Sequence, residues 1–404
     1  MFVDLIVVGG GAAGLFAAIT CAENSEKSVL VLEKTPRLLH KVKISGGGRC
    51  NVTHHCFEPR ELSRNYPRGE KSLIGPMHRF GAADTVDWFA GRGVTLKTEA
   101  DGRMFPDTDS SQTIVDTLIG AADAAGVVIH TSEGVTSIIK NEDTFDLETD
   151  AGNSYMAANV LIATGGTRID AGAKLAARLG HELQPPTPSL FTFKVTDPRL
   201  DGLLGLSANP AEVSIQQSKL RSRGSVLITH WGLSGPGILK ISAWGARELA
   251  ALDYRFDISV NWLPDADPAA VIAEKRINEG KRQLSSRSPF ASIPKRLWLR
   301  LLAAAGVSDT LTWSRLSKQQ ANQLLSQLTA ASFRVNGKST NKDEFVTCGG
   351  VDLNGINFRT MESKLVPGLY FAGEVIDVDG VTGGFNFQNA WTNGFHAGSD
   401  IAAR

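Results

Sequence analysis

The 404-residue sequence has few cysteines, no apolar run long enough to span a bilayer and no signal-peptide pattern at its start. The four cysteines are Cys21, Cys50, Cys56 and Cys348, too few and too scattered for a disulfide framework in a chain of this length. We therefore expect free thiols in a reducing compartment. These absences predict a cytoplasmic protein without a membrane partner.

An excess of charge of either sign is also lacking, because Lys and Arg number 42 and Asp and Glu number 42. Such a chain has no overall positive field to hold it on nucleic acid. We expect a small-molecule substrate and neither DNA nor RNA as a partner. Nothing in the sequence indicates the oligomeric state, and the length predicts two or three domains at roughly 150 residues each.

The first 33 residues follow the order of a parallel sheet. Residues 3–8 are an apolar run ending in a glycine cluster, residues 12–22 read as an alanine-rich helix, and residues 28–32 return as a second buried strand. Further strands of this kind are expected at residues 127–130, 159–163 and 368–372. The last lies far along the chain, so a large insertion must interrupt the sheet. The predicted fold class is α/β, a Rossmann-type domain built from both termini.

The insertion divides by composition into two parts. Residues 189–263 alternate like strands and predict an antiparallel sheet or barrel. Residues 267–330 predict a helical subdomain with helices over 269–284, 293–305 and 317–328. The predicted domains are residues 1–188 with 347–404 for the Rossmann-type domain, 189–264 with 331–346 for the β-rich domain, and 265–330 for the helical subdomain.

The helical subdomain is rich in basic residues. They are Lys275, Arg276, Lys281, Arg282, Arg287, Lys295, Arg296 and Arg300. Such a stretch forms either a solvated helical face or a surface for RNA or an acidic partner. We favour the solvated face, because no interleaved aromatics or recognised nucleic-acid motif accompany it.

A dinucleotide-binding turn joins the first strand to the first helix. Gly9, Gly11 and Gly14 supply G-x-G-x-x-G, in which the glycines permit a tight turn, close approach of the backbone to a pyrophosphate, and packing of helix on strand. The helix N-terminus offers free N–H groups to the phosphates. Glu33 ends the second strand, placed to accept hydrogen bonds from an adenosine ribose and to repel a 2′-phosphate.

A second anchor near the C-terminus favours FAD over NAD. Residues 368–374 form a strand ending in Gly373-Glu374, and residues 383–390 open a second helix after two glycines. An acid at a strand end can bind ribityl hydroxyls, and a helix N-terminus can stabilise negative charge on a reduced flavin. Residues 163–166 close another buried strand and bring a third stretch of backbone to the cofactor.

These motifs resemble bacterial flavoproteins of the YhiN/BaiN type, also described as NAD(P)/FAD-dependent or aminoacetone-oxidase-like oxidoreductases, within the glutathione-reductase-type FAD superfamily. The resemblance runs nearly end to end and rests on residues 8–14, 43–53, 102–106, 229–236 and 360–398. It implies an inserted β-rich domain carrying a helical subdomain, a loop at 45–53 beside the flavin, and backbone amides at 386–388 facing the flavin's pyrimidine edge. The loop at 166–173 is shorter than in these relatives.

The motifs and the resemblance together predict the cofactor-binding residues, with no metal site. They are Gly9, Gly11, Ala12, Ala13, Gly14, Glu33, Lys34, Ser45, Gly48, Arg49, Cys50, Asn51, Val135, Thr164, Gly165, Gly166, Gly373, Glu374, Gly384, Asn386, Phe387 and Gln388.

Catalytic side chains are fewer, because a flavin carries the redox step itself. Arg49 could stabilise a reduced flavin or bind an anionic substrate, or it could be a structural partner of a carboxylate. His230, before a turn that opens a helix at Pro236, could donate a proton or be structural. Cys50 and Cys56 could form a redox pair, although small residues packed in a glycine-rich loop are favoured.

No second G-x-G-x-x-G separates the two anchors, so no dedicated nicotinamide site is visible. NAD(P)H remains a candidate reductant, with reduction by the substrate itself as the other route. The sequence predicts an FAD-dependent oxidoreductase that transfers a hydride between flavin and a small organic substrate. The alternative is a flavin-binding partner or RNA-associated module without its own turnover.

Overall fold

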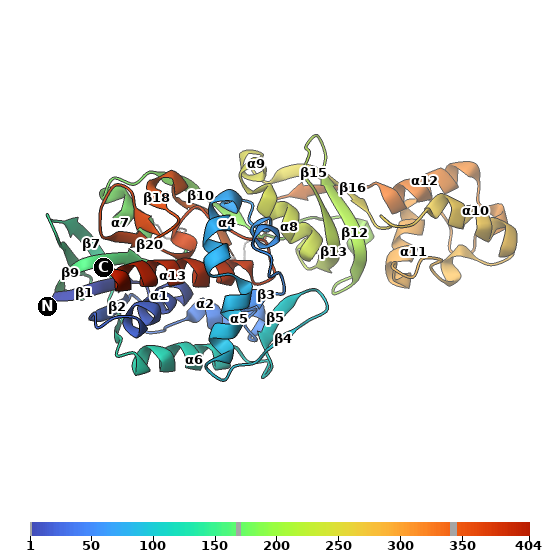
Figure 1. Ribbon diagram of the computed structural model, residues 1–404. Helices are drawn as coiled ribbons and strands as arrows, with labels where there is room; N and C mark the ends of the chain where they lie inside the picture. The colour runs from blue at the N-terminus through green and yellow to red at the C-terminus, as the bar shows by residue number, and fades with distance from the viewer. Residues whose placement is uncertain (1, 167–170, 340–345) are drawn as a thin grey trace. The chain divides into compact units, whose positions relative to one another are not determined.

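The computed structural model describes residues 2–166, 171–339 and 346–404. The chain forms two compact units, residues 1–187 with 346–404 and residues 188–345 (Figure 1). The unusual part of the loop predicted at 166–173 lies outside the described residues. No helix in the described ranges is long and apolar enough to cross a membrane.

A parallel sheet built from both ends of the chain organises the first unit. Its strands run in the order β20-β9-β1-β2-β6, all parallel. Their bounds are β1 Phe2–Val8, β2 Val29–Glu33, β6 Val128–Thr131, β9 Ser154–Ile162 and β20 Leu369–Phe371. The central strands are buried on both faces, as their continuous apolar runs predict. The predicted α/β Rossmann-type domain built from both termini is confirmed.

Shorter elements complete this unit. Antiparallel strands β7 and β8 join β9, and β18 and β19 extend the sheet beyond β20. The remaining bounds are α2 His40–Ile44, β3 Thr53–His54, α3 Pro59–Ser63, α4 Glu70–Arg79, α5 Ala82–Ala90, β4 Leu96–Thr98, β5 Arg103–Pro106, α6 Ser111–Ala124, β7 Val135–Lys140, β8 Phe145–Thr149, α7 Ala171–Arg178, β10 Leu183–Ser189, β17 Val346–Val351, β18 Ile356–Asn357 and β19 Glu362–Ser363.

The first and last helices of the unit pack directly on each other. These helices are α1 (Ala12–Glu23) and α13 (Phe385–Ala403), which lie side by side in Figure 1. A Cβ added at Gly394 would lie 2.7 Å from the Ala13 carbonyl oxygen, and one at Gly398 would collide with that of Ala17. Both glycines advance by four residues along α13 as their partners advance by four along α1, so the helices run parallel.

This pairing fixes the distance between the two helix N-termini. Gly394 lies opposite Ala13, yet α13 begins nine residues before Gly394 and α1 begins one residue before Ala13. At a rise of 1.5 Å per residue, the start of α13 lies about 12 Å beyond the start of α1 in the same direction. Two helix N-termini that point the same way with such an offset suit one elongated dinucleotide.

The second unit contains a six-stranded antiparallel sheet in the order β11-β14-β13-β12-β15-β16. Lys194 N donates to Gly337 O, which brings β11 next to the end of β16, so the sheet nearly closes on itself. This confirms the predicted barrel-like character. The bounds are β11 Phe193–Lys194, β12 Ser207–Ile215, β13 Arg221–Thr229, β14 Gly232–Ser234, β15 Arg255–Asn261 and β16 Ala331–Asn336.

The α-helices that accompany this sheet in the described part of the unit are α8 Pro236–Trp244, α9 Ala246–Ala251, α10 Pro268–Asn278, α11 Lys295–Ala304 and α12 Lys318–Thr329. The helix start expected at Pro236 is confirmed by α8, where Ile238 and Ile241 are buried at helical spacing. The wider expectation of strand-like character over 189–263 is wrong for residues 236–251, which form α8 and α9. The helix predicted over 269–284 ends at Asn278, because the chain turns at Gly280 to bond to residues 312–314.

One hydrophobic core joins the sheet and the helices of the second unit. Trp262 and Phe333 on the strand side and Trp298 on α11 are buried members of the same cluster. The Trp298 indole N–H donates to Leu284 O at 2.8 Å, which satisfies its polar atom inside that core. The helical part is therefore held on the sheet by shared burial and not by a linker alone.

Candidate cofactor site

In the first glycine turn, Gly9 and Gly14 leave no room for a side chain, whereas Gly11 faces open space. A Cβ at Gly9, whose φ is +113°, would lie 2.6 Å from Ala163 O, and one at Gly14 would collide with Gly9 O. A Cβ at Gly11 would meet no atom within 4 Å. The first helical bond is donated by Leu15 to Gly11, so the amides of Ala12, Ala13 and Gly14 precede the ladder. The turn thus presents free N–H groups to an open space that fits a pyrophosphate.

Glu33 is fixed against this turn. Its Oε2 accepts from Gly10 N and its Oε1 from Thr35 N, both at 2.8 Å. Each carboxylate oxygen keeps further acceptor capacity, so ribose hydroxyls can still bind. Lys34 follows Glu33 directly after β2. A Cβ at Gly134 would lie 2.9 Å from Lys34 Cγ, so Val135, the first residue of β7, lies close to Lys34. The geometry places the predicted adenosine-binding residues at one edge of the sheet.

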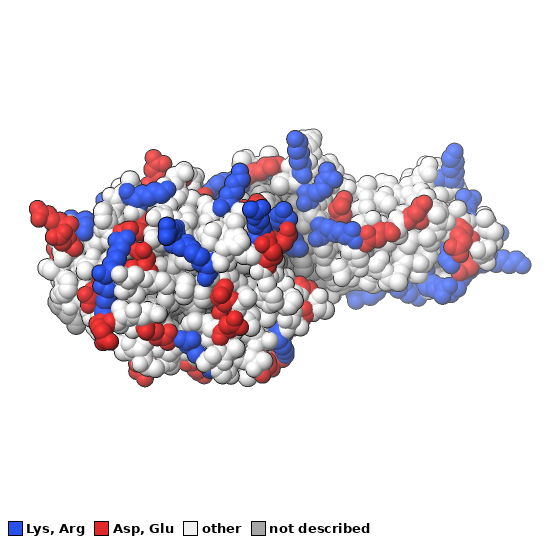
Figure 2. Space-filling model, in the orientation of Figure 1, with Lys and Arg blue, Asp and Glu red and all other residues white. Residues whose placement is uncertain are grey.

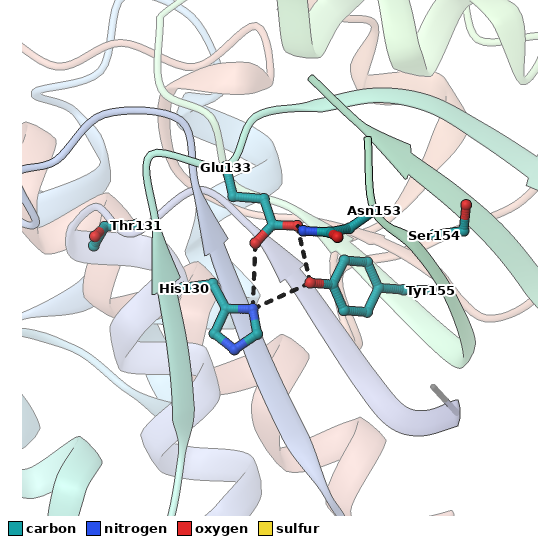
Figure 3. A pocket seen from close by; sticks show the side chains of 6 residues that line it. All are labelled: His130, Thr131, Glu133, Asn153, Ser154 and Tyr155. Carbon is teal, nitrogen blue, oxygen red and sulfur yellow. Dashed lines mark hydrogen bonds and ion pairs between the residues drawn. The ribbon is translucent and has the colours of Figure 1, made fainter. Parts of the chain in front are cut away.

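A polar pocket lies beside the end of β2 (Figure 3). It is a cleft of about 610 Å³ whose lining includes His130, Glu133, Asn153 and Tyr155. Glu133 Oε1 accepts from Asn153 Nδ2 at 2.8 Å and from Tyr155 OH at 2.9 Å, and Glu133 N donates to Glu33 O at 2.9 Å. Burial opposes ionisation, yet the hydrogen bonds from Asn153, Tyr155 and Thr149 hold the pKa of Glu133 below its usual value.

Sequence reasoning missed Glu133. Its partners come from β8, from the turn after it and from β9, and no spacing in the sequence links them. The buried carboxylate ties the loop before Val135 to these elements, and the Glu133 backbone N–H ties the same loop to the end of β2. Glu133 therefore fixes the loop that leads to Val135.

The loop at 45–53 is anchored to the start of α13. Gly48 N and Cys50 N both donate to Ser45 O, which folds the loop tightly. With its amide oriented to satisfy both neighbours, Asn51 donates to Thr53 O at 3.0 Å and accepts from Gly384 N at 2.9 Å. Added Cβ atoms at residues 47 and 48 would meet nothing within 4 Å. The loop therefore leaves open space over its glycines, as a segment passing beside a flavin requires.

The start of α13 offers fewer groups than predicted. Gln388 N donates to Gly384 O, and the Gln388 side chain is fully buried and bonded to Thr53 Oγ1 at 2.6 Å. Gln388 therefore supports the site from within and has no amide left for the flavin. The Asn386 side chain is held by Gly380 at 2.8 and 3.0 Å. The backbone amides of Asn386 and Phe387 precede the helical ladder and remain available.

Two further glycine segments meet between the anchors. A Cβ at Gly166 would lie 3.1 Å from Glu374 Oε2, and one at Gly373 would lie 2.9 Å from Ala13 Cβ. Glu374 forms an ion pair with Lys41. Gly165, at φ +79°, has open space where a Cβ would be, and Thr164 precedes it. These residues converge with the first turn on one side of the parallel sheet.

The two predicted catalytic side chains have different settings. Arg49 donates to Glu99 Oε1 at 2.6 Å and lies 3.4 Å from Asp109 Oδ1, with its guanidinium 4.0 Å from the centre of the Phe105 ring. This is the carboxylate pairing expected of a structural arginine. His230 is exposed in the turn between β13 and β14, in the second unit, whereas all the predicted cofactor-binding residues belong to the first. Catalytic roles for both residues stay predictions.

Cys50 and Cys56 are free thiols. Cys50 is fully buried, and burial raises its pKa to about 12. The pKa of Cys56 is also raised, by burial and by the nearby carboxylates Glu61 and Glu58. Thiol–disulfide exchange requires a thiolate, and both settings suppress it. The geometry favours packing over redox chemistry for this pair.

We predict that replacing both cysteines by alanine leaves reduction of the flavin unchanged. Without a disulfide to reduce, anaerobic titration should consume about two electrons per flavin in both proteins, with rates equal to within about twofold. A dithionite titration followed by visible absorbance measures this. Consumption of about four electrons by the wild-type protein, falling to two in the variant, would show a redox disulfide.

Two offset helix N-termini, an acid at the end of β2 and open glycines between them define the class: a flavoprotein that binds extended FAD. The chain belongs to the family described as the HI0933-like protein Rossmann domain, whose model matches residues 3–400. It is an FAD-dependent oxidoreductase, and the predicted YhiN/BaiN-type resemblance and FAD cofactor are confirmed.

Relatives of known activity match over nearly their whole length. The chain is 33% identical over 409 residues to a ribosomal RNA dihydrouridine synthase of Escherichia coli, covering 99% of this chain and 98% of the relative. It is 27% identical over 409 residues to a 3-dehydro-bile acid delta(4,6)-reductase of Clostridium scindens, covering 98% of each. A solved 3-ketosteroid delta1-dehydrogenase from Sterolibacterium denitrificans shares the fold, with a TM-score of 0.55, 11% identity and coverage of 100% and 99%.

Proposed function

We propose that this flavoprotein reduces a carbon–carbon double bond conjugated to a carbonyl group, and that the bond belongs to uracil within ribosomal RNA. The observation that supports this most directly is the 33% identity, over almost the full length of both chains, to a ribosomal RNA dihydrouridine synthase. A second such synthase, of Haemophilus influenzae, is 31% identical over 98% of both chains.

The reaction class is common to both kinds of relative. Forming dihydrouridine saturates the C5–C6 bond of uracil, which is conjugated to the C4 carbonyl, and a bile acid reductase saturates bonds conjugated to a ketone. When bound and reduced, FAD would supply the hydride for C6, and the proton for C5 would come from solvent. Residues of this chain would hold the cofactor by the amides of residues 12–14 and 386–387 and stabilise negative charge at the helix N-termini. NAD(P)H is the candidate that restores reduced flavin.

A small conjugated ketone is the second candidate substrate, supported by the identity to the bile acid reductase. The two candidates differ in size and charge and not in the bond reduced. The expectation that RNA is no partner rested on two observations. One was the overall charge, which is an average over parts of unequal charge, and the other was the absence of interleaved aromatics or a recognised nucleic-acid motif in the basic stretch. The relatives that modify ribosomal RNA weigh against that expectation.

In the test, purified holoprotein is incubated under anaerobic conditions with NADH or NADPH and with each of three substrates in parallel. They are a ribosomal RNA transcript, free uridine and a 3-keto steroid with a conjugated double bond. We expect dihydrouridine, measured by mass spectrometry of digested RNA, from the transcript alone. Saturation of the steroid with no change in the transcript would reject RNA as the substrate and favour the small ketone.

A further inference from the structure

We propose that the helical part of the second unit carries a phosphate-binding surface for RNA, centred on Arg276, Lys281 and Arg315. This inference rests on the proposed function for the identity of the partner, whereas the surface itself follows from charge and geometry. We call these three residues with Arg282 and Arg287 the basic cluster.

Charge in this chain is unevenly distributed. Residues 268–330 contain ten Lys and Arg against three Asp and Glu, although the whole chain is neutral. Figure 2 shows many of the basic side chains of this part along one edge of its surface. A local positive field of this kind attracts a polyanion that the average charge would not predict. The positive excess therefore belongs to residues 268–330 and not to the chain as a whole.

The backbone brings the members of the basic cluster together. The loop after α10 lies against the short helix η5 (Trp313–Arg315), because Ser314 N donates to Gly280 O at 2.9 Å and Trp313 N donates to Arg282 O at 3.0 Å. Trp313 is buried and stacks on Trp298, with ring centres 6.4 Å apart. Arg315 is thus held beside residues 280–282 by a backbone fixed to the core.

The carboxylates nearby are too few to neutralise the cluster. Glu279 receives Lys275 at 2.7 Å and both Arg282 and Arg287 at 3.3 Å, and Glu274 lies 4.0 Å from Lys275. Arg276, Lys281 and Arg315 are exposed, and no carboxylate of the described residues is paired with them within the 4.0 Å limit of an ion pair. These three cations are free to contact phosphates.

A purely structural role explains only part of this arrangement. Lys275 and Arg276 occupy the last turn of α10, where a cation stabilises the helix dipole. Lys281, Arg282 and Arg287 follow the helix end, and Arg315 comes from another element, so the dipole does not require them. Like charges gathered around one acid repel each other, and a bound polyanion would relieve that repulsion.

The experiment compares two triple variants of the full holoprotein. The first carries Arg276→Gln, Lys281→Gln and Arg315→Gln. The matched control carries Arg60→Gln, Lys219→Gln and Arg221→Gln, which removes the same charges from exposed residues without a carboxylate partner in the described structure. Filter binding of a ribosomal RNA transcript is measured across a range of KCl concentrations, with flavin content and thermal melting as folding checks.

We expect the first variant to bind the transcript about 10-fold or more weakly at low salt, and the slope of log K against log salt to fall by roughly 2 to 3. The control should keep nearly the affinity and slope of the wild-type protein. An equal loss of RNA affinity in both variants, or an unchanged salt dependence in the first variant, would contradict the proposed RNA-binding surface. Wild-type protein that binds an acidic peptide but not the transcript at low salt would also overturn it.

Dihydrouridine formation is measured separately, so the two proposals can fail independently. If the wild-type protein binds RNA through the basic cluster but forms no dihydrouridine, the surface stands and the reaction is rejected. If it forms dihydrouridine and the first variant does so with unchanged KM, the reaction stands and the surface is rejected. A raised KM with unchanged kcat in that variant supports the surface.

Discussion

Replacing Gly11 by valine is expected to leave the protein folded and to weaken FAD binding by about 100-fold or more, equivalent to about 2.7 kcal/mol. Gly11 has φ −87° and ψ −171°, an extended conformation that any residue adopts, and a Cβ there meets no protein atom within 4 Å. The valine side chain would instead fill the open space in front of the amides of residues 12–14. Flavin content after purification, and titration of apoprotein with FAD, measure the loss.

Gly120→Val is the matched control for this substitution. Gly120 lies within α6, has no positive φ, and a Cβ there also meets nothing within 4 Å. The control should keep full flavin content, because valine is at least as favourable as glycine within a helix and its side chain meets no protein atom there. Gly14→Val would not serve, since its Cβ collides with Gly9 O and a loss of flavin could reflect a loss of fold. Wild-type FAD affinity in Gly11→Val would contradict a pyrophosphate at this turn.

The parts of the site that the sequence predicts are those fixed by local geometry. Gly9, Gly11 and Gly14 predict a dinucleotide-binding turn because each position has its own steric requirement. Glu33 is predictable because it ends a recognisable buried strand. The C-terminal strand β20 is predictable for the same reason, as an apolar run before a glycine turn. Local patterns of this kind identify both anchors although more than 300 residues separate them.

The parts that escaped prediction depend on contacts between distant segments. The parallel packing of α1 on α13, which sets the offset between the two helix N-termini, needs Gly394 and Gly398 to meet Ala13 and Ala17. The role of Gln388 as an internal support appears only once Thr53 lies beside it. No spacing along the chain encodes such pairs, so their roles follow from the folded arrangement alone.

The distribution of charge over the surface also depends on the folded structure and cannot be obtained from the overall composition. A net charge of zero excluded nucleic acid at the level of the whole chain, yet an average conceals the separation of charge between parts. The basic cluster indicates an RNA-binding surface because the structure shows which of its cations share Glu279 and which have no carboxylate partner among the described residues. Charge should therefore be counted over each unit before a polyanionic partner is excluded.

Acidification is expected to destabilise the protein through His396, by about 2 kcal/mol at pH 5 and about 3 kcal/mol at pH 4 relative to pH 7. His396 is buried in α13, and its Nε2 hydrogen-bonds Pro76 O at 2.9 Å. Burial, with a smaller contribution from Arg79, lowers its pKa from 6.5 to about 4. Below pH 6.5 the imidazole of His396 is protonated in the unfolded chain but stays neutral in the folded chain. The free energy of unfolding therefore decreases as the pH falls from 7 towards 4.

His396→Gln removes this proton uptake and keeps a side chain able to donate to Pro76 O. Urea unfolding at equal FAD concentrations should show that the wild-type protein loses about 2 kcal/mol more than the variant between pH 7 and pH 5. The pKa of His181 is also lowered by burial, but that contribution is present in both proteins and cancels in the comparison. His78→Gln, at an exposed position of α4, should retain the wild-type pH dependence. Equal losses in wild-type and His396→Gln proteins would mean that the imidazole titrates near its ordinary pKa, and that the packing of α13 against α4 admits water.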